Sequence, residues 1–301
     1  MTKILITGGS GAIGRRLICK LQAKGHTVCV IGRTKHENLD VPSFTWDLNK
    51  GTLDERALSE ITHIIHLAGA GIANKRWTPS RKQEIVDSRV KSIELLGDFL
   101  KRRNQRIEAI ISSSAIGYYG TITSDKIFSE TDGSANDFLG KTCKQWEIAV
   151  KSFHGIAERE VRIRTGVVLM KEDGALPKLL KPTKLGLGAA VGSGKQWMPF
   201  IHVEDLIEIY TKAVEDDSML GAFNAAVAEH ATQTQVINQI AKTIGKPAFF
   251  PPIPAFIMKA VMGEMAEMIT KGSRVSSDKL ANAGFEFRYA TLSAALDNLL
   301  K

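Results

Sequence analysis

Residues Lys3–Arg16, which read KILITGGSGAIGRR, decide the fold of this chain. A β-branched and aliphatic run ends abruptly in glycines, and a helical pattern of apolar residues begins at Ala12. This order predicts a strand, a tight turn and a helix at the beginning of the sequence. The glycines of the turn, Gly8, Gly11 and Gly14, are spaced G-x-x-G-x-x-G.

Each of these glycines has a physical role in such a turn. Gly8 can adopt the backbone angles of a sharp strand-to-helix connection. Gly11 lets the main chain approach a pyrophosphate, and Gly14 lets the helix pack closely on the strand. The free N–H groups and the positive end of the helix dipole then face the phosphates. We therefore expect a dinucleotide-binding loop formed by Gly8, Gly9, Ser10, Gly11, Ala12, Ile13 and Gly14.

The length and composition are those of a globular protein. The 301 residues are 44% hydrophobic and 24% charged, which suffices for one large α/β domain and a smaller appendage. No apolar run approaches the length of a membrane span, and the charged Lys3 directly before a strand excludes a signal peptide. The three cysteines lack C-x-x-C spacing, which disfavours a zinc site and structural disulfides. We expect a cytoplasmic protein with no bound metal and no membrane partner.

The net charge of +8 is unevenly distributed. Basic residues outnumber acidic ones between positions 74 and 106, and the segment 174–195 contains lysines but no acid. Nucleic-acid binding is disfavoured, because no helix-turn-helix, RNP-like strand or zinc-finger signature is present. A solvated basic face and a basic mouth that attracts a phosphorylated cofactor or an acidic substrate are the two remaining interpretations.

Strand and helix patterns alternate through the first half of the chain, which predicts a doubly wound parallel sheet of Rossmann type. Ligands of such sheets bind beyond the carboxyl ends of the strands. The expected strands are 3–7, 27–32, 44–46, 63–67, 109–113 and 161–169, and the expected helices are 12–24, 53–60, 79–103 and 140–153.

Beyond residue 170 the pattern changes, and dense glycine and proline indicate excursion loops and short helices. We expect a Rossmann domain over 1–170, its sheet completed by later strands near 200 and 223. Residues 171–301 should form a smaller, mostly helical substrate lobe. The helices expected there are 203–215, 234–244, 255–262 and 292–300.

The residues after the second expected strand indicate which dinucleotide binds. An acidic side chain at this place accepts from a ribose 2′-OH, whereas an arginine accommodates a 2′-phosphate. The chain has Arg33 and Thr34 here and no acid until Glu37, so we expect NADP(H). Asp47 and Leu48 close the next strand, where Asp47 either accepts from an adenine amino group or serves as a turn residue.

Small and hydroxyl residues end the two following strands. Leu67, Ala68 and Gly69 allow backbone to approach the cofactor, whereas His66 is expected to be a packed core residue. Ser114 ends the next strand, and a serine at that place can hydrogen-bond a substrate carbonyl beside the nicotinamide. The remaining candidates for contact with the cofactor are Ser88 and Ser113.

The motifs T-G-G-S-G-A-I-G, H-L-A-G-A and S-S-S-A-I-G-Y-Y-G, in this order, resemble the extended short-chain dehydrogenase/reductase superfamily. Within it, the chain resembles the atypical NAD-dependent epimerase/dehydratase-like subfamily with a C-terminal domain of unknown function. The marks of that subfamily are Arg76–Thr78, Ser88–Val90, Phe138–Glu147, Gly186–Met198, Ile201–Asp205 and Gly263–Ala266. The resemblance covers nearly the whole chain and implies an NADP(H) site.

The resemblance also implies a catalytic Tyr-x-x-x-Lys dyad, in which the lysine lowers the pKa of the tyrosine. This sequence has no tyrosine at that spacing from a lysine: the fourth residues after Tyr118, Tyr119, Tyr210 and Tyr289 are Ile122, Thr123, Val214 and Ser293. Aligning Glu147 with the glutamate that follows the dyad puts Leu139 and Cys143 in its places. Candidate substitutes are Tyr118, Tyr119, Lys141 and Lys144, and packing is the alternative role for the tyrosines.

Two further segments supply candidates for the substrate side. The loop Gly186–Trp197 is expected to place Gln196 and Trp197 in the pocket. His202 precedes a helix, where it serves either as an acid/base group or in a capping network.

Two functions follow from these observations. The first is an NADP(H)-dependent oxidoreductase or epimerase-like enzyme for a small molecule, with Ser114, Tyr118 and His202 as catalytic candidates. The second is a catalytically silent NADP(H) sensor or interaction protein. The superfamily resemblance also allows a homodimer through helices such as 79–103 and 140–153.

Overall fold

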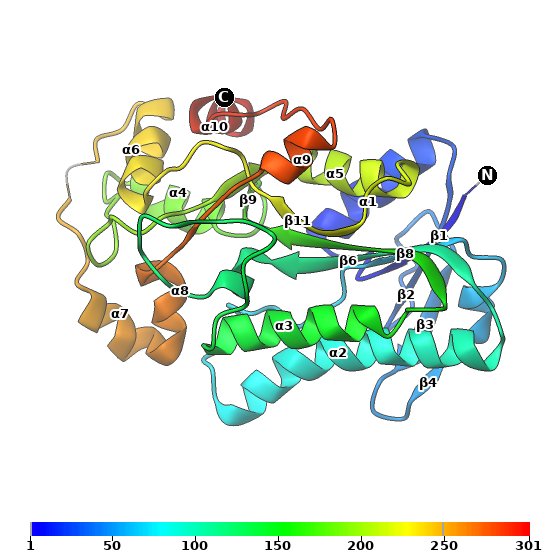
Figure 1. Cartoon of the computed structure of the whole chain (residues 1–301). Coiled ribbons are helices and arrows are strands. Elements are labelled where there is room, and N and C mark those ends of the chain that lie inside the picture. The colour runs from blue at the N-terminus through cyan, green and yellow to red at the C-terminus, as the bar shows by residue number, and fades with distance from the viewer. Residues whose placement is uncertain (1, 249) are drawn as a thin grey trace.

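An eight-stranded sheet forms the centre of the molecule (Figure 1), and the computed structural model describes residues 2–248 and 250–301. The strand order is β11-β8-β6-β5-β1-β2-β3-β4, and only β4 runs antiparallel to its neighbour. The strands are β1 (Lys3–Thr7), β2 (Thr27–Gly32), β3 (Ser43–Asp47), β4 (Thr52–Leu53), β5 (His63–His66), β6 (Ile107–Ala115), β8 (Ala157–Thr165) and β11 (Gly221–Ala225).

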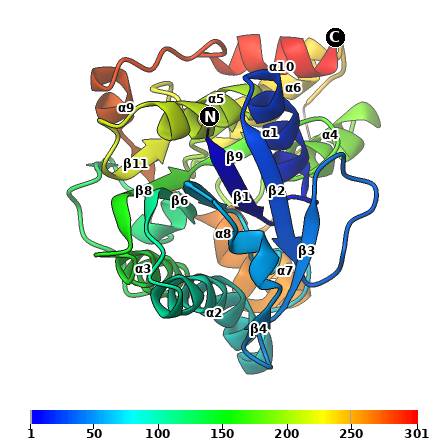
Figure 2. The ribbon, with the colours of Figure 1, turned by 90° about the vertical axis from the view of Figure 1, so that its right-hand side faces the viewer.

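Helices cover both faces of the sheet and give the three layers seen in Figure 2. Alternating side chains of β1 explain the layers, since Ile4 and Ile6 enter one core and Leu5 enters the other. This arrangement confirms the doubly wound parallel α/β fold. The first face is covered by α1 (Ala12–Ala23) and α5 (Val203–Glu215), and the second by α2 (Pro79–Arg102), α3 (Phe138–Lys151) and the 3-10 turn η1 (Glu55–Leu58).

A separate core forms in the smaller lobe, where Leu169, Leu176, Phe200, Ile240 and Leu296 are fully buried together. Its elements are the strand pair β9 (Val167–Leu169) and β10 (Phe200–His202) and the helices α4 (Leu176–Lys184), α6 (Gln233–Thr243) and α10 (Leu292–Leu300). The other elements are η2 (Ile116–Tyr119), α7 (Ala255–Met262), η3 (Gly263–Ala266), α8 (Glu267–Thr270), α9 (Asp278–Asn282) and the pair β7 (Ile127–Phe128) and β12 (Arg274–Val275). Among the described residues, no helix is long and apolar enough to span a bilayer.

Several expected elements agree with the structure to the residue, namely β1, β2, α5, α7 and α10. The helix expected over 53–60 is wrong. Leu53 pairs with Trp46 in the short antiparallel strand β4, and only a 3-10 turn follows. Asp54 explains the turn, because its carboxylate accepts a hydrogen bond from the Arg56 N–H and caps it.

The strand expected over 161–169 is two strands, β8 and β9, separated at Gly166. The Gly166 N–H donates to the Ala225 carbonyl of β11, and the next residue donates to Pro199 beside β10. The strand expected near 223 is β11, which pairs with β8 in the main sheet. The strand expected near 200 is β10, which pairs with β9 instead. The helix α4 was expected only as one of several short helices, because Pro177 and Pro182 lie within it.

We predict that Gly14→Ala destabilises the fold. A Cβ at Gly14 would lie 2.6 Å from the Gly8 carbonyl oxygen and 2.7 Å from the Gly9 Cα, and both are backbone atoms. Relieving such an overlap costs about 1–3 kcal/mol. Urea unfolding followed by circular dichroism measures the loss. Gly133→Ala is the matched control, because a Cβ there meets no atom within 4 Å. Equal midpoints for the two variants would contradict the prediction.

Candidate functional site

The glycine loop lies where β1 meets α1. Gly8 has φ +71°, and a Cβ there would lie 3.0 Å from backbone atoms of Leu67 and Ala68. At Gly11, the N-cap of α1, a Cβ would meet only the Gly8 carbonyl oxygen, at 3.4 Å, so this position opens outward. No side chain caps α1 and its first turn contains no acid, which leaves N–H groups and the positive dipole end for an anion.

The loop opens on a cleft of about 1460 Å³ at the carboxyl ends of β1, β2, β3 and β5. Most of the expected cofactor-binding residues line it: Gly8, Gly9, Ser10, Gly11, Arg33, Thr34, Asp47, Leu48, Leu67, Ala68, Gly69 and Ser88. Ala12, Ile13 and Gly14 form the first turn of α1 behind the loop. Ser113 lies elsewhere, on the α5 side of β6, where it contacts Tyr210.

The far end of the cleft is basic. Arg33 and Lys75 form no hydrogen bond or ion pair within residues 2–248 and 250–301. The acids nearby are paired already, because Glu84 binds Arg81 at 2.6 Å and Asp87 binds Lys91 at 2.8 Å. The hydrogen bond from Arg81 lowers the pKa of Glu84, and the charges of Lys75 and Arg33 lower it further. Arg33 is therefore available to an anionic ligand.

Asp47 combines the two roles considered for it. Its carboxylate lines the cleft, and its Oδ1 accepts the N–H groups of Asn49 at 2.9 Å and Lys50 at 3.1 Å. It is a turn residue in this structure, and its contact with adenine stays a prediction.

The end of β5 is held by side chains from two neighbouring elements. The Thr7 hydroxyl accepts the N–H groups of Leu67 and Ala68, and the Ser88 hydroxyl accepts the Ala70 N–H at 2.9 Å. Arg89, which the sequence analysis did not select, donates to the Ala70 carbonyl at 3.1 Å. Its only signal in the sequence was its place in the Ser88–Val90 mark of the subfamily.

Arg89 also lies beside the position aligned with the family lysine. Its guanidinium packs over the Trp146 ring at 4.9 Å, and its charge acts on Cys143. Burial lowers the pKa of Arg89 and raises that of the Cys143 thiol to about 12. Near neutral pH, therefore, the cation at this place belongs to Arg89 of α2, while Cys143 of α3 is an uncharged thiol.

A buried hydrogen-bond network occupies the end of β6. The Ser114 hydroxyl donates to Glu147 Oε1 at 2.8 Å, and Arg164 binds both oxygens of the same carboxylate at 2.8 and 2.9 Å. Arg164 also donates to the Tyr119 hydroxyl, which donates to Asn224 at 2.7 Å. In the sequence Glu147 served only for alignment, and the network could not be found there because its members come from five different elements: β6, α3, β8, η2 and β11.

This network determines the states of the two candidates that belong to it. Ser114 is 2% exposed, lines neither the cleft nor the cavity beside α3 described below, and gives its proton to a carboxylate. Its contact with a substrate carbonyl stays a prediction. Burial raises the pKa of Tyr119 to about 12, so this tyrosine is a protonated packing residue. Tyr118 differs, because it is half-buried and lies under the Arg164 guanidinium, whose Cζ is 3.6 Å from its ring centre.

The other candidates lie away from the cleft. His202 is the N-cap of α5: its Nδ1 accepts the Glu204 N–H, and its ring packs on Tyr289. Burial lowers the pKa of His202, against the opposing effect of Glu204 and Asp205. The expected capping network is therefore present, and an acid/base role stays a prediction.

The substrate-side loop holds its two candidates in contacts within the protein. Gln196 is 2% exposed and its amide donates to the carbonyls of Val191 and Ile269. The Trp197 indole donates to the Ser124 carbonyl. Neither residue lines the cleft or the cavity beside α3, and both anchor the loop through these hydrogen bonds. Their contact with a substrate stays a prediction. No group of three or more His, Cys, Asp or Glu in the described residues could hold a metal ion.

Comparisons with known proteins agree with this geometry. The sequence profile described as the NAD-dependent epimerase/dehydratase family matches residues 4–143, and a domain of unknown function (DUF1731) matches residues 253–299. Epimerase family protein YfhF of Bacillus subtilis is 33% identical over 99% of this chain and 97% of its own length. The chain belongs to the NAD-dependent epimerase/dehydratase family.

Solved structures of other proteins have the same fold. Human epimerase family protein SDR39U1 (isoform 2), solved with NADPH, superposes with a TM-score of 0.88 at 29% identity, and covers 99% of both chains. UDP-glucuronic acid 4-epimerase from Bacillus cereus, solved with UDP-glucuronic acid and NAD, has a TM-score of 0.80 at 20% identity, covering 99% of this chain and 98% of that one. At that identity the second likeness shows the fold alone.

The end of β5 leads to a prediction on pH. His66 is fully buried, as expected of a core residue, and its Nε2 lies 2.7 Å from the Ser92 hydroxyl. Burial lowers its pKa to about 3. Below pH 6.5 His66 is therefore protonated in the unfolded chain but stays neutral in the folded protein. The free energy of unfolding consequently falls as the pH drops from 6.5 towards 3.

Between pH 7 and pH 5 this histidine should cost about 2 kcal/mol of stability. His66→Gln should remove that share of the pH dependence in urea unfolding series at the two pH values. His154→Gln, at an exposed position, is the control and should keep the wild-type dependence. An unchanged pH dependence in His66→Gln would contradict the assignment.

Proposed function

We propose that this protein is an NADP(H)-dependent oxidoreductase or epimerase-like enzyme that acts on a small molecule without the usual Tyr-x-x-x-Lys dyad. The observation that carries the proposal is the amino end of α1, which has no side-chain cap and opens on a 1460 Å³ cleft. Arg33 lies at the far end of this cleft and has no ion-pair partner in the part of the chain that the structure describes. Membership of the epimerase/dehydratase family supports a nicotinamide dinucleotide in this cleft, and the NADPH of human SDR39U1 supports the phosphorylated form.

The residues present fit such a cofactor. The outward-facing Gly11 and the N–H groups of α1 would bind the pyrophosphate, since no side chain competes for them. Arg33 would bind the 2′-phosphate, because the nearby carboxylates of Glu84 and Asp87 are already neutralised. The backbone at Leu67–Gly69 would lie against the nicotinamide half. When bound, the nicotinamide supplies a carbon that gives or accepts hydride.

The proton-handling group of the proposed enzyme differs from the usual dyad. Burial raises the pKa of the Tyr119 hydroxyl and of the Cys143 thiol to about 12, so both groups are uncharged near neutral pH. Arg89 supplies the positive charge beside Cys143, where the family pattern has a lysine. We assign Arg89 a positioning role, with Ser114, Tyr118 and His202 as the candidates for contact with substrate.

A catalytically silent NADP(H) sensor is the second candidate function. The observation that favours it is the Ser114 hydroxyl, which donates its proton to Glu147 while Ser114 lines neither the cleft nor the cavity beside α3. In a sensor, the buried network would only fix the end of β6. The two functions differ in turnover and agree on cofactor binding.

Turnover separates the two functions. Oxidation of NADPH, followed by its fluorescence against a panel of carbonyl metabolites, should find at least one substrate. With that substrate, Ser114→Ala should lower kcat on the order of 100-fold, as expected for loss of a donor to a developing oxyanion. NADPH affinity should stay within about threefold, because Ser114 does not line the cleft.

Ser59→Ala removes a hydroxyl from an exposed position and is the matched control. Tight NADPH binding without turnover across the panel would favour the sensor. Turnover that is unaffected in Ser114→Ala would exclude this serine from the chemistry.

Cofactor choice is tested at Arg33. Arg33→Asp should weaken NADPH binding on the order of tenfold or more, because it removes a charge-assisted partner of the 2′-phosphate. NADH, which lacks that phosphate, should change by less than about threefold by the same argument. Calorimetry measures both affinities.

Lys35→Asp makes the same change of charge two residues away, at an exposed side chain that does not line the cleft. It should affect NADPH binding much less than Arg33→Asp. Equal losses of NADPH and NADH affinity in Arg33→Asp would refute the assignment of NADP(H).

A further inference from the structure

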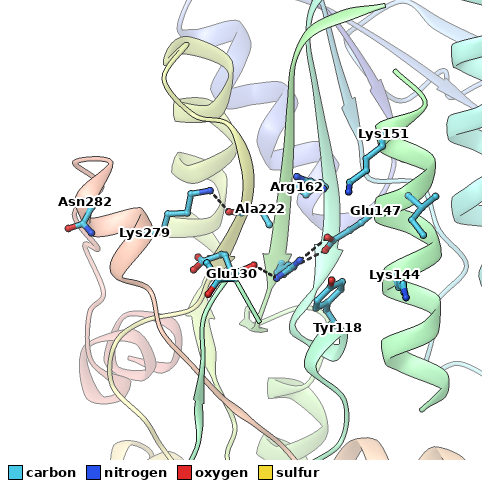
Figure 3. A pocket seen from close by; sticks show the side chains of 12 residues that line it. Tyr118, Glu130, Lys144, Glu147, Lys151, Arg162, Ala222, Lys279 and Asn282 are labelled. Atoms are coloured by element: carbon cyan, nitrogen blue, oxygen red, sulfur yellow. Dashed lines mark hydrogen bonds and ion pairs between the residues drawn. The ribbon is translucent and has the colours of Figure 1, made fainter. Parts of the chain in front are cut away.

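A second cavity, of about 630 Å³, lies between α3 and the outer strands β8 and β11 (Figure 3). Its lining residues come from α3, from the even-numbered positions of these strands, from α9, from the loop at residues 130–131 and, with Tyr118, from η2. None of them lines the cleft assigned to the dinucleotide. We call this cavity the basic pocket.

On this face of the sheet α3 lies beside β6 and β8, with α2 on its other side (Figure 1). Arg162 and Arg164 point to the same face of β8, since residues two apart in a strand share a side. Arg164 is buried against α3, whereas Arg162 lies beyond the edge of that helix and is half-buried.

Positive charge in the basic pocket exceeds negative charge. Arg164 and Glu147 neutralise each other in a bidentate pair. The cations that remain are Lys144, Lys151, Arg162 and Lys279, and the one other acid in the lining is Glu130. Within the described residues, the side chains of Lys144, Lys151 and Arg162 form no hydrogen bond or ion pair. Figure 3 shows Lys151 reaching from α3 towards Arg162, with Lys279 on the opposite side.

Arg162 has a free hydrogen-bond donor for an anion, and Lys279 has a positive charge that no acid neutralises within the described residues. Arg162 Nε is buried without a hydrogen-bond partner in the described part of the chain. Lys279 donates only to the carbonyls of Leu220 and Ala222, at 2.9 and 2.7 Å, so its charge is not neutralised there. Both cations flank Gly221, where a Cβ would lie 3.5 Å from Arg162 Nη2 and 3.6 Å from Lys279 Nζ.

The pKa of Lys279 reflects the positive charges that lie close to it. Burial lowers its pKa, Glu130 opposes the change, and the neighbouring Arg162 and Arg164 lower it further. A bound anion would relieve the repulsion between these cations.

We propose that the basic pocket binds a small phosphate-bearing molecule, separate from the dinucleotide. Four unneutralised cations against one carboxylate call for a ligand with more than one negative charge. The guanidinium of Arg162 matches phosphate through its planar pair of donors, and the lysines act as point charges. A volume of 630 Å³ is within the range of small-molecule sites. Tyr118 and the 54%-exposed Ile148 offer apolar surface for an organic part.

The basic pocket shares a wall with the network at the end of β6. Glu147 and Arg164 line the pocket, and Glu147 Oε1 accepts the Ser114 hydrogen bond on its other side. A ligand in the basic pocket would therefore contact Glu147, which accepts the hydrogen bond of Ser114. It would contact no residue that lines the cofactor cleft.

Titration calorimetry with inorganic pyrophosphate tests the proposal, with and without saturating NADPH. With NADPH filling the cleft, one site should still bind pyrophosphate, because the two cavities have no lining residue in common. Without NADPH, the amino end of α1 can add a second site, so the variants are compared in saturating NADPH. Arg162→Met should weaken this binding on the order of tenfold, since it removes a charge-assisted donor pair. Arg106→Met removes the same charge from an exposed arginine outside the pocket and should change it less than about twofold.

Lys279→Met should also weaken binding, with thermal unfolding as a check on folding because Lys279 joins two backbone carbonyls. If Lys279→Met unfolds, Lys151→Met replaces it in the test, because the Lys151 side chain forms no hydrogen bond within the described residues. Lys151→Met should also weaken pyrophosphate binding. Acetate at the same ionic strength should bind far more weakly than pyrophosphate. The proposal is overturned if the protein does not bind pyrophosphate, or if saturating NADPH abolishes that binding. It is also overturned if Arg162→Met and Arg106→Met bind pyrophosphate equally well, or if acetate binds as tightly as pyrophosphate.

Discussion

The contact between Gly14 and the backbone of Gly8 and Gly9 is the constraint on which the cofactor cleft depends. With no side chain at Gly14, α1 begins directly on the end of β1, where a Cβ would lie 2.6 Å from a carbonyl oxygen. This closeness directs the first N–H groups of α1 into the cleft and seats Gly8 against the backbone of Leu67 and Ala68. The loop, the helix dipole and the end of β5 thus meet at one place. This geometry is possible because Gly8 and Gly14 have no Cβ.

Local periodicity explains how much of the fold the sequence predicts. The strands β1 and β2 and the helices α5, α7 and α10 were predicted to the residue because each carries its own apolar pattern and its own boundary residues. The failures have non-local causes. Leu53 lies in a strand because Trp46 pairs with it, and the strand break at Gly166 depends on partners near residues 199 and 225. No window of sequence around these residues contains the partners.

The candidate site also has a part that local sequence predicts and a part that depends on distant residues. The cofactor half depends on backbone and on short segments, so Gly8–Gly11, Arg33 and the end of β5 could be predicted from motifs and their spacing. The network at the end of β6 could not, because Ser114, Glu147 and Arg164 come from three elements and meet only through the strand order. Arg89 was missed because a helix pattern does not show which strand end an arginine reaches. The anchoring role of Gln196 could not be predicted either, because its amide donates to a carbonyl more than seventy residues away.

The buried pair of Glu147 and Arg164 also limits which groups remain for chemistry. A buried ion pair is costly to break, and this one is saturated by Ser114 and Tyr119, so its members are fixed in place rather than free to exchange protons. Tyr119 is bound at its hydroxyl by Asn224 and Arg164. Tyr118, its neighbour, makes no hydrogen bond through its hydroxyl within the described residues, yet it lies against the same guanidinium at 3.6 Å. Of the two adjacent tyrosines, Tyr118 is therefore the one with a hydroxyl free to meet a ligand and a cation beside its ring.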